Sequence, residues 1–81
     1  MPNYIATFHT HLAAMRSSRS LKGRAETVAL SPVPRALSSS CGTCVRYTAA
    51  DDCREAMDVD LESIALSLGD EKYQLIYRAE E

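Results

Sequence analysis

The predicted fold depends on the segment AADDCREAMDVDLESIALSL, which runs from Ala49 to Leu68. Its apolar residues recur at steps of three and four, the spacing that places side chains on one face of an α-helix. They are Cys53, Met57, Leu61, Ile64, Ala65 and Leu68. Acidic residues stand where they favour the start of a helix, and Gly69 stands where a helix stops. The pattern therefore predicts a helix that follows Ala49–Asp52 and ends at Gly69.

Alternating apolar and polar residues predict four strands, three before this helix in the chain and one after it. They are Tyr4–His9, Glu26–Ser31, Val45–Thr48 and Lys72–Arg78. Another helix is predicted from His11 to Lys22, with Thr10 as its N-cap and Gly23 just beyond its end. The order β-α-β-β-α-β predicts an α+β, ferredoxin-like fold, in a single domain spanning residues 1–81. In that fold, two helices cover one face of a four-stranded antiparallel sheet.

Length and composition exclude several classes of protein. The 81 residues suffice for one small domain, and 46% hydrophobic with 25% charged residues is ordinary for a globular protein. The net charge of −2 argues against a general nucleic-acid binder, which usually carries a basic excess. No apolar run approaches the roughly 18 residues that would span a bilayer, and the N-terminus lacks a secretion-signal pattern. We therefore expect a cytoplasmic protein with neither a membrane nor a nucleic-acid partner.

The chain contains three cysteines, Cys41, Cys44 and Cys53. An odd number is a poor disulfide framework, and thiols in a reducing cytosol stay free unless they are catalytic, redox-active or metal-bound. Cys41 and Cys44 form a Cys-Gly-Thr-Cys motif at the end of a loop, residues 32–44, which is rich in serine and proline. Nearby cations and backbone N–H groups favour the reactive thiolate, and this loop offers Arg35 and a glycine. We therefore expect Cys41 to be the most reactive thiol, and Cys53, on the apolar helix face, the least.

The same loop resembles that of a known family. Pro34-Arg35 is followed by Ser38-Ser39-Ser40-Cys41-Gly42, in a short chain that opens with Ile-Ala-Thr-Phe-His-Thr. These motifs are similar to those of small bacterial proteins of the selenium/sulfur carrier-like family. The resemblance implies a carrier whose cysteine, here Cys41, holds selenium or sulfur as a persulfide-type adduct. It also implies that five residues surround and bind the adduct: Arg35, Ser38, Ser39, Ser40 and Gly42.

Three functions are compatible with these residues. A carrier needs only Cys41, and its partners would be sulfur or selenium donor and acceptor proteins, with no cofactor. A CxxC thiol-disulfide or redox-sensing module needs Cys44 as a second catalytic residue. A metal-binding or interaction domain would use Cys41 and Cys44, with His11 as a further ligand, although the spacing matches no standard zinc finger. Substituting Cys44 separates the first two functions, because the carrier survives that change and the redox pair does not.

A homodimer is also predicted, from the face of the sheet that the two expected helices leave uncovered. Ile5, Thr7 and Ile76 occupy strand positions that point toward this face. Small domains often bury such a surface against a second copy, usually about a two-fold axis.

Overall fold

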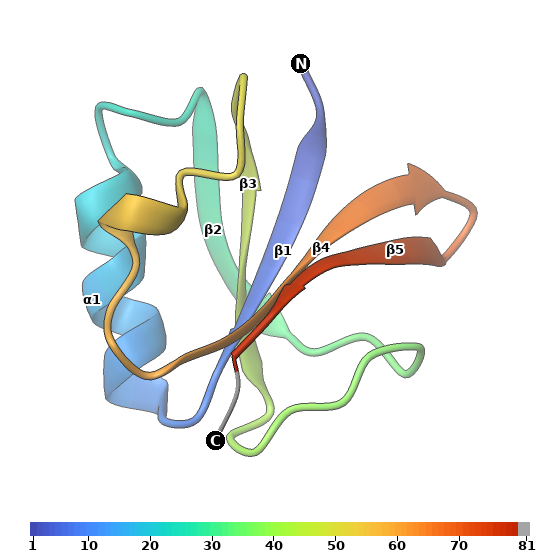
Figure 1. Cartoon of the computed structure of the whole chain (residues 1–81), viewed down its shortest axis with the longest axis horizontal. Helices are drawn as coiled ribbons and strands as arrows, with labels where there is room; N and C mark the ends of the chain where they lie inside the picture. The colour runs from blue at the N-terminus through green and yellow to red at the C-terminus, as the bar shows by residue number, and fades with distance from the viewer. Residues whose placement is uncertain (80–81) are drawn as a thin grey trace.

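The fold is built around one antiparallel sheet, shown in Figure 1. The computed structural model describes residues 1–79. Five strands pair in the order β2-β3-β1-β4-β5, and one α-helix, α1, packs against them. In chain order the elements are β1 (Asn3–Phe8), α1 (His11–Leu21), β2 (Thr27–Pro32), β3 (Thr43–Thr48), the short 3-10 helix η1 (Arg54–Ala56), β4 (Leu61–Gly69) and β5 (Lys72–Arg78). Within residues 1–79, no helix is long and apolar enough to cross a membrane.

The ferredoxin-like arrangement predicted from the sequence is wrong. The sheet has five strands rather than four, and over residues 1–79 one α-helix covers it rather than two. The four predicted strands are confirmed as β1, β2, β3 and β5, and the first helix as α1, with ends that agree within two residues. The error lies between Asp51 and Leu68, where the chain forms η1 and β4 in place of the second helix.

Local hydrogen bonds explain why no α-helix starts after Ala50. The Asp51 carboxylate accepts a hydrogen bond from the backbone N–H of Cys53 (2.8 Å). In the same way, the Asp58 carboxylate accepts from the N–H of Asp60 (3.0 Å). Short acidic side chains that bond to the backbone two residues ahead stabilise turns in competition with helix. Cys53 also has a φ of 52°, which is not compatible with a continuing α-helix.

The second half of the expected helix is strand β4. From Ile64 to Leu68, large apolar residues alternate with small ones, which is the period of a strand. β4 pairs with β1 on one side and β5 on the other, and the two-residue turn Asp70–Glu71 closes the β4–β5 hairpin. Both turn residues have positive φ, 52° and 59°, as in the type I′ turn that matches the twist of a hairpin. The glycine and acidic residues at 69–71 thus mark a hairpin turn rather than a helix end.

Helix α1 covers one face of the sheet and encloses the main core with it (Figure 1). Thr10 is its N-cap as predicted, because the Thr10 hydroxyl accepts from the N–H of Ala13 (3.1 Å). Under the helix, the rings of Tyr4 on β1 and Tyr47 on β3 stack with centroids 5.3 Å apart. The other buried members of this core are Ala6, Phe8, Ala13, Ala14, Leu21, Val45, Ala49, Cys53, Leu61 and Ile64.

The opposite face of the sheet is partly covered by the chain itself. Figure 1 shows the β2–β3 loop and the β4–β5 hairpin projecting on the side away from α1. Ile5 is 1% exposed and Thr7 is 0% exposed, so a single chain already buries these two residues. This burial removes the argument on which the homodimer was predicted, and only Ile76 of the three residues stays exposed. The dimer itself remains a prediction that a sedimentation experiment would test.

Candidate functional site

The predicted functional loop connects β2 to β3, and we call its residues 33–42 the thiol loop. Backbone hydrogen bonds shape it at both ends. The N–H of Val33 donates to the carbonyl of Gly42 (3.1 Å), which closes the loop, and the N–H of Leu37 donates to the carbonyl of Pro34 (3.0 Å), which makes a turn at its tip. Gly42 has a φ of +75°, a conformation that a residue with a side chain adopts only with strain. The backbone that closes the loop therefore favours a glycine directly after Cys41.

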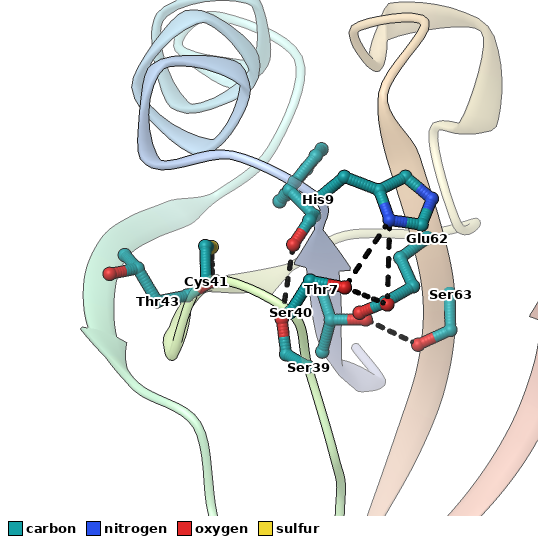
Figure 2. A network of polar contacts seen from close by, with 9 residues as sticks. Thr7, His9, Ser39, Ser40, Cys41, Thr43, Glu62 and Ser63 are labelled. Atoms are coloured by element: carbon teal, nitrogen blue, oxygen red, sulfur yellow. Dashed lines mark hydrogen bonds and ion pairs between the residues drawn. The ribbon is translucent and has the colours of Figure 1, made fainter.

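Cys41 lies near the closed end of the thiol loop and is partly exposed. It is a free thiol, and its Sγ donates a weak hydrogen bond to the carbonyl of Thr43 (3.4 Å), as drawn in Figure 2. The Thr43 hydroxyl also lies 3.2 Å from Nδ1 of His11, the first residue of α1. The thiol is thus hydrogen-bonded to the first residue of β3, and that residue also contacts the start of α1.

Two serines of the thiol loop attach it to the sheet (Figure 2). The Ser39 hydroxyl donates to the carbonyl of Phe8 at the end of β1 (3.0 Å). The Ser40 hydroxyl donates to Oε2 of Glu62 at the start of β4 (3.0 Å). His9 lies beside this pair, with its Nδ1 3.6 Å from Glu62 Oε2 and 3.5 Å from the Ser40 hydroxyl. We call these contacts the serine clamp, because they hold a loop without regular structure at a fixed place next to two strand ends.

Two buried polar side chains of the sheet lie next to the serine clamp. Thr7 and Ser63, from adjacent strands, share a hydrogen bond of 2.6 Å below Ser40 and Glu62 (Figure 2). The second carboxylate oxygen of Glu62, Oε1, is buried and has no hydrogen-bond partner among residues 1–79. A buried polar oxygen is costly unless donors compensate it. The Ser40 hydroxyl is therefore important to Glu62 as well as to the loop.

The other two cysteines are buried. Cys44 is 0% exposed, and its Sγ donates to the carbonyl of Pro32 (3.6 Å). Burial raises the pKa of the Cys44 thiol, and the nearby Arg46 guanidinium offsets only part of that effect. Burial likewise raises the pKa of Cys53, helped by a hydrogen bond to Asp51. Cys41 is thus the single cysteine of the three that solvent reaches without a change of structure.

The structure divides the predicted ligand-binding residues into two groups. Ser39, Ser40 and Gly42 lie next to Cys41, where the two serines are used to hold the loop. Arg35 and Ser38 instead face strand β5 and line hollows between the loop tip and that strand. The expected approach of Arg35 to Cys41 is therefore not a contact in this structure.

The residues that contact the loop from other elements were not predicted from the sequence. His9 and Glu62 complete the clamp, and they lie 31 and 22 residues from Ser40 along the chain. No spacing motif links positions so far apart, so only the sheet reveals their proximity. For the metal-site alternative, no group of three or more His, Cys, Asp or Glu side chains within residues 1–79 is arranged to hold a metal ion.

The family can now be assigned. The model of the family described as "Putative Se/S carrier protein-like" matches residues 3–66, which include the thiol loop, the serine clamp and all three cysteines. The chain belongs to this Se/S carrier-like family. No curated protein and no solved structure matched the chain. The Se/S carrier-like match ends inside β4, so it contains the whole thiol site but not strand β5.

Proposed function

We propose that this member of the Se/S carrier-like family carries one sulfur or selenium atom on Cys41 between partner proteins. The observation that supports the proposal is the contrast among the three thiols. Cys41 is partly exposed in a loop held by the serine clamp, whereas Cys44 and Cys53 are buried with raised pKa values. Only a thiolate that another molecule can approach serves as nucleophile for an atom transfer between proteins.

The loading step needs a persulfide donor and no separate oxidant. The Cys41 thiolate attacks the terminal sulfur of a donor persulfide, R–S–SH, and forms a new S–S bond to it. The donor's own S–S bond breaks, its electron pair stays on the inner sulfur, and that sulfur leaves as a thiol after taking up the proton. Delivery is the same exchange in reverse, with the acceptor's thiolate attacking the outer sulfur and Cys41 leaving. Selenium is carried by the corresponding step from R–S–SeH.

The protein's contribution to this chemistry is position. The Thr43 carbonyl accepts the S–H of the resting thiol and orients the sulfur. The serine clamp limits loop motion, so the adduct is presented at one place on the surface. A carrier needs this presentation more than it needs an enclosed pocket, because the other reacting sulfur arrives on a partner protein.

The CxxC redox pair is the less well supported alternative. A disulfide with Cys41 would require Cys44 to leave its buried position on β3 and its contact with the Pro32 carbonyl. Its raised pKa also keeps the Cys44 thiol protonated, which slows attack on a mixed disulfide. Donor and acceptor proteins in the reducing cytoplasm are therefore the partners and the compartment that we propose for a single-thiol carrier.

Intact mass spectrometry tests the proposal. The protein is incubated with glutathione persulfide, or with its selenium analogue, and the mass is read without reducing agent. We expect one added sulfur or selenium atom on the native protein and on Cys44→Ser and Cys53→Ser, and no addition on Cys41→Ser. An adduct that persists in Cys41→Ser would refute the carrier site, and loss of the adduct in Cys44→Ser would support the redox pair instead.

A further inference from the structure

A groove runs between the tip of the thiol loop and strand β5, on the face of the sheet away from α1. It consists of two adjoining hollows that share Ala36 and Tyr73 in their walls. We call it the arginine groove, after the three arginines in its walls. The argument below uses six of its residues: Arg35, Leu37, Arg46, Tyr73, Leu75 and Arg78.

The charge of this groove is opposite to that of the chain. Among residues 1–79, three arginines and one acidic residue, Glu71, line it, whereas the whole protein has a net charge of −2. Arg46 donates to the hydroxyl of Ser31 (3.1 Å). Arg35 and Arg46 have no carboxylate within ion-pair distance in the described part of the chain, where arginine ion pairs are made by other residues. Within residues 1–79 these guanidinium groups therefore have no carboxylate partner, and a carboxylate from outside could bind them.

Between the arginines the groove is apolar. Leu75 is 50% exposed on β5, and the partly buried Tyr73 and Leu37 lie in the same hollow. An exposed leucine between basic residues, in a concave surface, is the arrangement that receives an amphipathic segment of another protein. From Tyr73 to Arg78, strand β5 extends about 17 Å, which is the length of about six extended residues.

We propose that the arginine groove binds an extended acidic segment of a partner protein. Acidic side chains at the two ends of the segment bind Arg35 with Arg46 and, at the far end, Arg78. Apolar side chains between them pack on Leu37 and Leu75. Such a segment would alternate, with every second residue facing the groove, because successive side chains of an extended chain point to opposite sides.

The groove lies next to the thiol loop. Ser38 is in its wall, and Cys41 follows three residues later in the chain. A partner bound here would be held against the same loop that carries Cys41, which is the one step of this inference that rests on the proposed function. The binding itself does not need the thiol, so Cys41→Ser should bind the segment as well as the native protein does.

Fluorescence anisotropy with a labelled synthetic peptide tests the groove directly. The probe is Glu-Ser-Leu-Ser-Leu-Ser-Glu, which presents two glutamates and two leucines on one side. We expect saturable binding, a weakening of at least about fivefold in Arg35→Glu and in Arg46→Glu, and a steep loss of affinity between about 0.05 and 0.5 M salt. Leu75→Ser should weaken binding as well, whereas Val59→Ser, at a site 95% exposed elsewhere on the surface, should not.

Matched controls decide between the groove and general charge attraction. Arg19→Glu changes an exposed arginine on α1, on the other side of the sheet, and should leave the affinity unchanged. The peptide with lysine in place of both glutamates should not bind. Equal weakening by Arg19→Glu, or binding of the lysine peptide, would overturn the proposal. Displacement of the probe by inorganic phosphate or by a single-stranded oligonucleotide at equal concentration would also overturn it, in favour of a small-anion or nucleic-acid site.

Discussion

Replacing Ser39 with alanine should loosen the thiol loop without unfolding the sheet. The Ser39 hydroxyl donates to the carbonyl of Phe8, a residue that is 0% exposed. Its removal takes away one hydrogen bond and leaves a buried acceptor without its donor. A change of this kind costs about 1–2 kcal/mol. Because the contact joins only the loop to the end of β1, the cost should appear mainly as easier opening of the loop.

Hydrogen exchange at the backbone N–H of Val33 measures that opening. This N–H bonds to the Gly42 carbonyl and exchanges only when the loop opens. An opening equilibrium shifted by about 1–2 kcal/mol corresponds to a rise in exchange of about 5- to 30-fold. Alkylation of Cys41 by iodoacetamide should rise with it, because opening exposes the part of the sulfur that is buried in the native loop.

The neighbouring serine supplies the control. Ser38 is exposed and lies one position from Ser39, and we expect Ser38→Ala to leave both rates within about twofold of the native values. If Ser39→Ala leaves exchange at Val33 unchanged, or if Ser38→Ala accelerates it equally, the serine clamp does not hold the loop.

Three further predictions concern the cysteines and the hairpin. At neutral pH a limiting thiol reagent should label Cys41 first and Cys53 last; early labelling of Cys53, read by peptide mapping, would contradict the burial argument. Burial raises the pKa values of Cys44, Cys53 and Tyr47, so the folded state keeps protons that the unfolded state releases. The free energy of unfolding should therefore fall as the pH rises above 9.0, the ordinary pKa of the thiols, and urea midpoints that stay level up to pH 10 would contradict this. Glu71→Gly should stabilise the protein by about 0.5–1 kcal/mol, because glycine adopts the positive φ of the turn without strain; an equal gain in Glu71→Ala, measured by urea denaturation, would show another cause.

The sequence was sufficient where the local signals agree with one another. Strands β1 and β5 follow from alternation within six or seven residues, and α1 begins at the Thr10 cap that the sequence indicated. The segment after Ala50 failed because two local signals conflict there. Its apolar residues fit a helix at steps of three and four, but Asp51 and Asp58 bond to the backbone and form turns. The alternation from Ile64 and the turn before Lys72 were the signals that could have identified the β4–β5 hairpin.

The candidate site was only partly predictable for a related reason. The cysteine and the loop around it are contiguous in sequence, so the motif was visible. The contacts that hold the loop join Ser39 to Phe8 and Ser40 to Glu62, which lie 31 and 22 residues apart along the chain. Such contacts depend on the strand order, in which β1 lies between β3 and β4 and brings the ends of the three segments together. The predicted four-stranded fold placed Glu62 on its second helix, so this contact could not be foreseen from it.

The two proposed sites share the thiol loop, but only the arginine groove also needs strand β5. The Se/S carrier-like match covers residues 3–66 and so includes the thiol loop with every residue of its clamp. The arginine groove needs Tyr73, Leu75 and Arg78, which all lie on β5 beyond that match. If the thiol chemistry is common to the family, β5 is the part of the groove that lies outside the matched residues, and we expect it to contribute to partner choice together with Arg35 and Arg46. Changes on β5 should therefore alter which protein the carrier meets while leaving persulfide loading from a small donor intact, because that reaction requires only access to Cys41.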